Sequence, residues 1–468
     1  MMFPTFALAT IVLAAVAGAQ SAPIDIGSRV EPFVDGQLID RLAGADLTLQ
    51  HPIRREVVLV TDMSWEGPSS GYFTAIQDGA TVRIYYRGYC PVDDSKEQVT
   101  CMVESSDGIH FTRPKLGLFA FGGSRDNNIV WRGVESHNFA PLLDRNPACP
   151  PDERYKALGG IAPALWAFAS PDGIHWKRKG DHPALTHGTF DSLNTAFWDD
   201  RAKLYRCYSR YFDGEVRAIQ SSTSKDFLNW TEPVPNRYAA GIPHDQFYTN
   251  GTRPCLGAEH ILLSFPSRFV PERTKLPNYH DPGVSDSVFM TSRDGLNWDR
   301  MFLDGWLRTG PDDRNWSQRS NMPACGIVSV DPNEFSMYAT EHYQWPDNRL
   351  RRISIRKFGW ASVHAPRRGG EMVTRPIVFS GRSLCINYAT SAAGSIRVEI
   401  QDADGSPIPG YRLEEMDTLF GDELNRPVTW KGSTDVSKLS GRTVRLRFVL
   451  QDADLFSLQT VQGDVQRR

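Results

Sequence analysis

The sequence of 468 residues predicts an all-β fold, a five-bladed β-propeller followed by a small C-terminal β-sandwich. Two observations carry this prediction. A hairpin of the form Ser-x-Asp-Gly-x-x-aromatic returns at intervals of about 60 residues, and self-similarity at such a period is typical of propeller blades. Each copy follows strand-like runs, such as TVRIYYRGY and QVTCMVES in the first unit, so a unit supplies several strands.

The repeated hairpin is interpreted as a marker of the fold rather than as a reactive site. Four copies begin at Ser105, Ser170, Ser224 and Ser292, and a decayed fifth copy keeps Ser354 and Trp360. Glycine supplies the positive φ that closes such a turn, and the Ser and Asp side chains bond to amides within it. The aromatic residue six places after the serine starts the returning strand and is expected to pack between neighbouring sheets.

The two ends of the chain differ from the repeated part. Residues 1–22 are apolar and end in small residues, which predicts a secretory signal peptide, with an uncleaved anchor as the alternative. The propeller is expected over residues 23–366, with its blades starting near residue 45. Residues 371–468 lack the hairpin and alternate as strands, which predicts a β-sandwich with a structural or carbohydrate-binding role. We therefore expect a secreted or periplasmic protein without a further membrane span.

Composition excludes several classes of partner and cofactor. The formal net charge of −3 favours neither nucleic acid nor an anionic membrane as partner. The seven cysteines form no Cys-x-x-Cys or Cys/His metal pattern, and no cofactor is expected. Histidines beside carboxylates leave a structural metal open, although no ligand spacing indicates one. Cys90 and Cys101 could pair across a hairpin, or the cysteines could be buried as small hydrophobic residues. The sequence leaves the oligomeric state open.

Polar residues lie where a propeller forms its pocket, at the starts of first strands and the ends of second strands. The carboxylates at these places are Glu66, Asp191, Asp245 and Glu341. The other polar residues, predicted to bind substrate, are Arg87, Arg210, Arg268, Arg319, His137, His244, His342, Asn138 and Asn321. An ordinary packed channel would carry small or apolar side chains there more often.

Several carboxylates in one pocket suit the cleavage of a glycosidic bond. One carboxylic acid with a raised pKa protonates the leaving oxygen, while an ionised carboxylate activates water or attacks the anomeric carbon. Asp191 and Glu341 are the leading candidates. The alternative is that some of these groups cap strands or pair with the nearby arginines. The sequence does not separate a retaining from an inverting mechanism.

The arginines allow two interpretations. Arg87, Arg210 and Arg268 fall at matching positions of three units, where they could neutralise structural carboxylates. If they converge instead, they would form a bidentate site for a carboxylate or sulfate and would favour an acidic or sulfated sugar. His137, His244 and His342 could donate to hydroxyl groups or act as acid and base.

These features together resemble a known group of enzymes. Five units, a signal peptide, polar first strands and a C-terminal sandwich are similar to the secreted five-bladed glycoside hydrolases, the clan of invertases, levansucrases and arabinanases. The stretch EPFVDGQLID (31–40) resembles uncharacterised exported bacterial members of that clan. The hairpins SPDGIHW and SRDGLNW also resemble the Asp-box of sialidases, a structural motif, but are one residue shorter. The Asn-Asp-Pro-Asn, Arg-Asp-Pro and Glu-Cys signatures of family 32 are absent, so the candidate residues rest on blade position.

The resemblance and the residues together predict a secreted glycoside hydrolase acting on a poly- or oligosaccharide. Paired carboxylates in the propeller channel would cleave the bond. Two alternatives remain open at this point. One is a non-catalytic carbohydrate-binding propeller, which needs arginines and aromatics but no paired carboxylates. The other is a sialidase-like enzyme with an arginine cluster, which would also need a Tyr-Glu nucleophile pair and usually six blades, whereas five units are counted.

Overall fold

The computed structural model describes residues 22–89, 97–277 and 279–463, and these are built almost wholly from β-strands, which confirms the predicted all-β class. Within these ranges the helices are short 3-10 turns: η1 (Val134–Asn138), η2 (Pro151–Glu153), η3 (Asp313–Asn315), η4 (Leu413–Glu415) and η5 (Ser437–Leu439). The predicted signal peptide, apart from Ala22, and Cys90 lie outside the described residues. Cys101, the proposed partner of Cys90, is buried.

Three consecutive four-stranded antiparallel sheets begin at residue 71, and in each the order in space is the order along the chain. The first sheet contains β6 (Gly71–Asp78), β7 (Thr81–Tyr89), β8 (Gln98–Ser105) and β9 (Ile129–Arg132). The second contains β10 (Phe139–Leu143), β11 (Tyr155–Ile161), β12 (Ala164–Ser170) and β13 (Lys177–Lys179). The third contains β14 (Thr195–Asp199), β15 (Leu204–Asp213), β16 (Val216–Ser224) and β17 (Val234–Pro235).

A fourth group of strands repeats this path with interruptions. Its strands are β19 (Gln246–Thr249), β20 (Arg253–Cys255), β21 (Ala258–Ser264), β22 (Ser267–Val270), β23 (Val284–Ser287) and β24 (Met290–Ser292). They form two three-stranded sheets, β19-β22-β23 and β20-β21-β24. Beside them, β18 (Arg237–Tyr238) pairs in parallel with β25 (Asn297–Trp298).

The fifth group is completed by a strand from the other end of the chain. Its sheet contains β26 (Glu334–Glu341), β27 (Arg349–Arg356) and β5 (Ile53–Val60). Residues 322–328 run beside β26 through the bridges Pro323–Ala339 and Val328–Ser336. An N-terminal strand therefore forms the outer edge of the last sheet.

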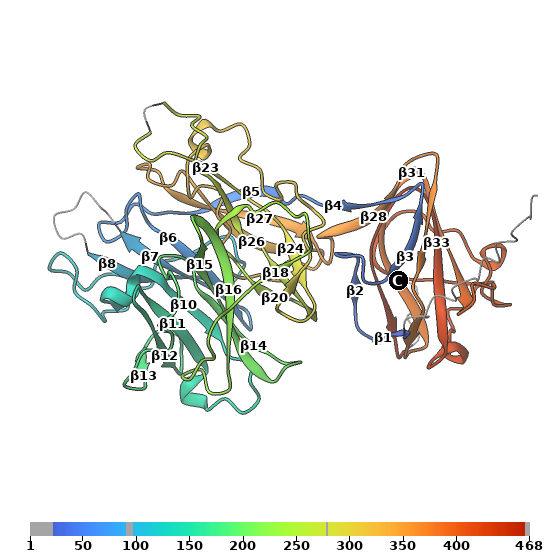
Figure 1. The fold of residues 1–468 in the computed structure, drawn as a ribbon, viewed down its shortest axis with the longest axis horizontal. Coiled ribbons are helices and arrows are strands. Elements are labelled where there is room, and N and C mark those ends of the chain that lie inside the picture. Colours follow the sequence, from blue (N-terminus) through green and yellow to red (C-terminus); the bar gives the residue numbers. More distant parts are fainter. Residues whose placement is uncertain (1–21, 90–96, 278, 464–468) are drawn as a thin grey trace, which may run out of the picture.

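The apolar cores of these five groups are arranged in a cycle. Buried clusters join the first group to the second, the second to the third, the third to the fourth and the fourth to the fifth. A fifth cluster contains Phe73 and Tyr86 of the first group together with Tyr338 and Leu350 of the fifth. Because the last group packs on the first, the five groups form a closed ring, seen in Figure 1 as the body that carries β5 to β27.

The second body in Figure 1 contains strands from both ends of the chain in one ten-stranded sheet. The N-terminal strands are β1 (Ile24–Gly27), β2 (Glu31–Pro32), β3 (Ile39–Ala43) and β4 (Asp46–Leu49). The C-terminal strands are β28 (Ala361–Ala365), β29 (Gly370–Thr374), β30 (Ile377–Phe379), β31 (Ser383–Asp402), β32 (Asp422–Pro427) and β33 (Thr443–Val461). The long strands β31 and β33 pair antiparallel and bend across its core.

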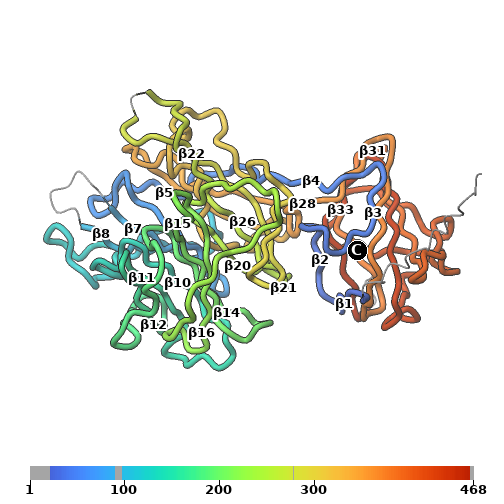
Figure 2. The backbone as a smooth tube through the Cα atoms, viewed as in Figure 1, coloured from blue at the N-terminus to red at the C-terminus, as the bar shows by residue number. Residues whose placement is uncertain are grey.

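This pairing differs from the domain boundaries expected from the sequence. Residues 23–366 were expected in the propeller, yet β1–β4 and β28 pair within the C-terminal sheet. Figure 2 shows the N-terminal segment running from this sheet toward the ring beside the C-terminal strands. The strands β1 to β4 are short and sit beside partners more than 300 residues away in sequence, so local patterning could not place them.

A buried charge cluster links the two bodies. Arg293, in the hairpin of the fourth group, donates from Nε to Asp35 at 2.7 Å and from Nη1 to Glu31 at 3.2 Å. Burial alone would raise the pKa of Glu31, but a hydrogen bond from His260 and the charge of Arg293 lower it to about 2. The ring and the C-terminal sheet are therefore joined by an ionised, fully buried glutamate.

The repeated hairpins have the local structure predicted for them. In the copy at Ser170, Asp172 Oδ1 accepts the amides of Ile174 and His175, each at 2.8 Å, and Ser170 Oγ accepts the Gly173 amide at 2.9 Å. The carbonyl of Gly173 accepts the hydroxyl of Tyr85, which lies in the neighbouring sheet. Equivalent bonds run from Tyr208 to Gly295 and from Tyr338 to Gly108. The hairpins thus also connect adjacent sheets.

The third copy of the hairpin keeps this backbone without glycine. Phe227 has a φ of 67°, close to the 77° of Gly173 and the 83° of Gly295 in the matching turns. Phe227 is buried between the second and third groups, beside Tyr205 and Trp230. Apolar burial therefore holds a side chain in a backbone conformation that usually requires glycine.

Candidate functional site

The innermost strands of the ring begin at one mouth of its channel. Tyr72 is the second residue of β6, Tyr248 lies in β19, and Met322 precedes β26, and these residues share one buried cluster with Leu193. The hydroxyls of Tyr72 and Tyr248 are 3.2 Å apart. Four non-glycine residues at this mouth have positive φ, namely Tyr72 (55°), His342 (56°), Asn321 (60°) and Arg319 (62°). Backbone strain of this kind, about 1–3 kcal/mol per residue, persists only where surrounding contacts hold it.

Asp191 is the exposed carboxylate of this mouth. Its Oδ1 accepts a hydrogen bond from His137 Nε2 at 2.7 Å and another from the Tyr72 hydroxyl at 3.2 Å, and its Oδ2 lies 3.7 Å from Arg210. The side chain of Asp191 is 49% exposed. Burial of the rest of the group would raise the pKa of Asp191, but the hydrogen bond from His137 and the charges of His137, Arg210 and Arg87 lower it to about 2. Asp191 is therefore ionised at neutral pH.

Arginines gather around this carboxylate. Arg87 Nη2 and Arg319 Nη1 both donate to the hydroxyl of Tyr343, at 3.0 Å and 3.3 Å. The guanidinium of Arg87 lies 4.6 Å from the ring centre of Tyr72, and that of Arg210 lies 5.1 Å from the ring of Tyr248. The cation–π contacts and the shared hydroxyl keep like charges close together.

Arg217 adds a fourth positive charge to the group. Its guanidinium lies 5.9 Å from the ring of Tyr248 and 5.4 Å from that of Phe212, an exposed aromatic side chain. Burial and the neighbouring charge of Arg210 lower the pKa of Arg217. Burial is the larger cause and the charge of Arg210 the second, and an incoming anion would offset both.

Several donors of these arginines have no hydrogen-bond partner. The buried nitrogens without one are Nε of Arg87, Arg210, Arg217 and Arg319, and Nη1 of Arg210. A buried donor that lacks a partner costs about 1–3 kcal/mol, more when it is charged. Four guanidinium groups lie near two carboxylates, Asp191 and Asp281, so positive charge is in excess here and favours the binding of an anionic group.

Five predicted residues are brought together by the structure, and they are Arg87, His137, Asp191, Arg210 and Arg319. Asn138 supports them from behind, because its Nδ2 donates to the carbonyl of Phe190 at 3.1 Å. Arg319 is also held by Asp281, which accepts from its Nη2 at 2.7 Å.

The other three candidate carboxylates lie in ion pairs of their own. Glu66 is fully buried and accepts from Arg113 Nε at 2.9 Å and Nη2 at 2.8 Å. Asp245 accepts from Arg300 at 2.6 Å. Glu341 accepts from three arginines, namely Arg54 at 3.2 Å, Arg349 at 2.9 Å and Arg351 at 2.7 Å. No two of the four predicted carboxylates share a hydrogen-bond or ion-pair partner within the described ranges.

The remaining predicted residues also have structural partners. Arg268 forms a two-point pair with Asp286 at 2.9 Å and 2.6 Å, and His244 lies 3.3 Å from Asp213. Asn321 donates to the carbonyls of Ser285 and Asn315. His342 is buried between Asp312 and Asp347, each 2.8 Å from one ring nitrogen. These residues hold the loops around the mouth rather than lie beside Asp191.

Sequence reasoning missed Tyr72, Tyr248, Tyr343, Arg217 and Asp281. A signal for two of them was present, because Tyr72 in GYFT and Tyr248 in QFYT occupy the first strands of their units. Arg217 lies near the start of the third strand of its unit, where position in the blade did not predict a site residue.

The described residues hold no group of three or more His, Cys, Asp and Glu side chains arranged to bind a metal ion. In the same ranges, no helix has the length and apolarity needed to cross a membrane.

Comparison with known proteins gives likeness in structure alone. No protein-family model and no curated protein matches the chain. An N-acetylgalactosamine deacetylase from F. plautii, in complex with blood group B trisaccharide, is 13% identical with a TM-score of 0.44, covering 67% of this chain and 96% of that one.

Two further solved structures come from studies of glycoside hydrolases. One, from work on the GH130 family and β-1,2 mannosidic linkages in Candida mannan, is 12% identical with a TM-score of 0.40 and covers 70% of this chain and 96% of that one. An α-L-arabinofuranosidase from Podospora anserina, in complex with cellotriose, is 11% identical with a TM-score of 0.43, covering 66% and 96%. Likeness at this level transfers no activity to this chain.

Proposed function

We propose that this protein is a glycoside hydrolase whose site around Asp191 takes an anionic sugar residue, carrying a carboxylate or a sulfate, of a poly- or oligosaccharide. One observation carries the proposal. An ionised, half-exposed aspartate lies where four arginines with unused donors converge. The arginines would hold the anionic group through charge-assisted, two-point hydrogen bonds. The exposed ring of Phe212 at the edge of the site offers a stacking surface for a sugar ring.

In this proposal Asp191 acts in its ionised form. It takes a proton from water, or it attacks the anomeric carbon, as the bond from that carbon to the leaving oxygen breaks. The leaving oxygen receives a proton from a second group, for which Asp281 is the candidate because it contacts the Asp191 network through Arg319. Burial raises the pKa of Tyr72 well above its usual value, so its hydroxyl stays protonated and donates to Asp191.

Two other functions have specific support. A non-catalytic carbohydrate-binding propeller needs no paired carboxylates, and Glu66, Asp245 and Glu341 are each held in ion pairs away from Asp191. A sialidase-like enzyme needs an arginine cluster, which the four arginines provide, and a Tyr-Glu pair, in place of which Tyr72 contacts Asp191. Activity, and the charge of the substrate cleaved, separate these alternatives.

The rest of the proposal concerns the setting of the site. We propose that the five groups of strands are the blades of a five-bladed propeller, since their cores form a closed cycle. The clan of invertases, levansucrases and arabinanases remains the proposed relationship. We also propose that residues 1–22 are a signal peptide for export, and that the second body is a β-sandwich that supports the ring.

The test is a panel of matched anionic and neutral polysaccharides. Polygalacturonate, alginate and sulfated galactans are incubated with the protein beside neutral galactan and arabinan, and reducing sugar is measured. We expect reducing sugar to be released from an anionic polysaccharide of the panel. The rate of release should fall about 1,000-fold in Asp191→Asn. It should be unchanged in the control Asp152→Asn, which alters an exposed aspartate. Saturable binding without release would support the carbohydrate-binding alternative. Equal release from Asp191→Asn would overturn the assignment of the site.

A further inference from the structure

A cavity of the ring lies at the opposite mouth of the channel from Asp191. Its volume is about 600 Å³, within the usual range for small-molecule sites. It is lined by the far ends of the innermost strands whose beginnings form the Asp191 site. In β6 the chain runs from Tyr72 at one mouth to Gln77 at the other, and in the fourth group from Tyr248 to Arg253. The buried cluster of Tyr72, Leu193 and Met322 separates the two mouths.

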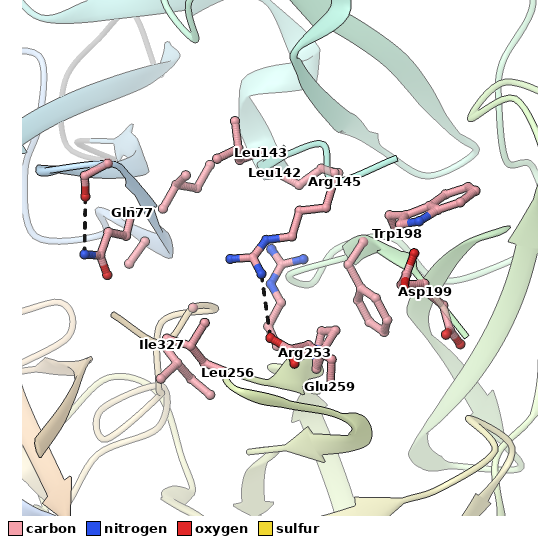
Figure 3. Close-up of a pocket in the computed structure, with 17 residues that line it drawn as sticks. Gln77, Leu142, Leu143, Arg145, Trp198, Asp199, Arg253, Leu256, Glu259 and Ile327 are labelled. Carbon is pink, nitrogen blue, oxygen red and sulfur yellow. Dashed lines mark hydrogen bonds and ion pairs between the residues drawn. The ribbon is translucent and has the colours of Figure 1, made fainter. Parts of the chain in front are cut away.

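The walls of this cavity are largely apolar. Figure 3 shows Leu142 and Leu143 on one side and Leu256 and Ile327 on another, with Trp198 at the edge. Phe197 lines the same space. These side chains offer a surface that fits a molecule with an apolar body.

The polar groups of the cavity leave one positive charge uncompensated. Asp199 and Asp200 have cations of their own, because Arg206 lies 2.5 Å from Asp199 and Lys203 lies 2.7 Å from Asp200. Two further arginines, Arg145 and Arg253, point into the cavity beside one glutamate, Glu259 (Figure 3).

Glu259 neutralises at most one of these two arginines. Its Oε1 lies 3.8 Å from Arg145 Nη1, beyond hydrogen-bond distance. Arg253 donates to the carbonyl of Ala196, and no carboxylate is its ion-pair partner within the described ranges. A guanidinium without a carboxylate, inside an apolar cavity, is a ready partner for an anion from outside.

We propose that this cavity is a second binding site, for a small organic monoanion: one carboxylate or sulfonate on an apolar, ring-containing body. Arg253 and Arg145 hold the acid group, and Phe197, Leu256 and Ile327 cover the body. The site is separate in place and in chemistry from the Asp191 mouth. The proposal does not depend on the glycosidase function.

The test uses a fluorescent probe of this chemistry and its neutral counterpart. The full chain is titrated with 8-anilinonaphthalene-1-sulfonate and, separately, with N-phenyl-1-naphthylamine. We expect one saturable sulfonate site, and we expect Arg253→Met and Arg145→Met each to weaken it by about tenfold while the neutral probe is little affected. Ile327→Trp, which fills the cavity, should abolish binding of both. Arg308→Met, an exposed arginine outside the cavity, serves as the matched control.

Each outcome decides the proposal. Thermal melting confirms that each variant is folded, and Arg145→Met changes a side chain that is 61% exposed, so it tests the charge even if Arg253→Met is unstable. Sulfonate binding that survives Arg145→Met and Ile327→Trp, or several weak sites in place of one, overturns the proposal. Binding lost in Arg210→Gln would place the probe at the Asp191 mouth and overturn it as well.

Discussion

The regions around Glu341 and Asp191 are both arginine clusters built on one carboxylate, yet they differ in how the charges are used. Glu341 is 3% exposed and bonds to Arg54, Arg349 and Arg351. Asp191 is 49% exposed, and its nearest arginine, Arg210, is 3.7 Å away. The arginines around Glu341 donate hydrogen bonds to its carboxylate, whereas several guanidinium nitrogens around Asp191 have no hydrogen-bond partner.

The ion pairs of Glu341 stabilise the fold, whereas under the proposed function the arginines near Asp191 bind a ligand. A buried carboxylate that accepts from three guanidinium groups has most of its lone pairs in use and no space for a substrate. The exposed carboxylate of Asp191 accepts from His137 and Tyr72 through Oδ1, while its Oδ2 lies 3.7 Å from the nearest arginine and has no hydrogen bond to it. Satisfaction of hydrogen bonds, more than residue type, therefore distinguishes the two clusters, and under the proposed function it identifies Asp191 as the reactive one.

The largest expected effect in this comparison is on stability, at Glu341. Glu341→Gln leaves three arginines around an uncharged side chain, and breaking such a buried pair costs about 3 kcal/mol of unfolding free energy. Urea unfolding measures the loss. Activity per folded molecule should stay at the wild-type value at low temperature. A variant that is as stable as wild type but inactive would mean that Glu341 belongs to the catalytic machinery.

A smaller effect is expected on substrate binding, at Arg210. Arg210→Gln removes a charge beside Asp191 and should raise KM for an anionic substrate by about tenfold, with kcat changed much less. Steady-state kinetics on the substrate found in the panel measure both constants. Arg125→Gln, an exposed arginine of the first group, is the matched control. Equal loss on neutral and anionic substrates would contradict the role of Arg210 in anion binding.

The smallest effect is expected in the pH dependence, at His137. The pKa of Asp191 lies near 2, below its ordinary 3.8, and the hydrogen bond from His137 is the largest cause that lowers it. A depressed carboxylate pKa favours the folded, ionised form above pH 3.8, and this contribution is lost as the pH falls through 2. Wild-type kcat/KM should therefore stay constant as the pH falls from 4 to 3. In His137→Gln the acid limb should move up toward 3.8.

The control for this experiment is His182→Gln, which changes an exposed histidine bonded to the carbonyl of Pro183. The acid limb of that variant should match wild type. An unchanged limb in His137→Gln would show that the carboxylate that controls activity is not held by His137.

The sequence anticipated the parts of the molecule that depend on local chemistry. The hairpin at Ser170 closes as expected because its Ser, Asp and Gly act within seven residues. Of the candidate site, Asp191, His137 and Arg210 were found because they occupy entry or exit points of strands.

What the sequence could not supply depends on partners that are distant along the chain. Glu66 and Asp191 both precede the first strand of a unit in the sequence. In the structure, however, Glu66 is buried and pairs with Arg113, which is 47 residues away along the chain. The N-terminal strands were assigned to the wrong body for the same reason, because β3 pairs with β29. In the sequence, Tyr72 and Tyr248 cannot be told from ordinary strand residues. Only the structure shows that their hydroxyls lie together between two sheets.

The completion of the fifth group by β5 has a consequence for how the chain is made. β5 pairs with β27, and β1 to β4 pair with strands that follow residue 360. During synthesis on the ribosome these early strands have no partners until most of the protein has emerged. The nascent chain therefore carries exposed β edges for most of translation, and it is in this period, rather than after folding, that chaperones have the most to protect.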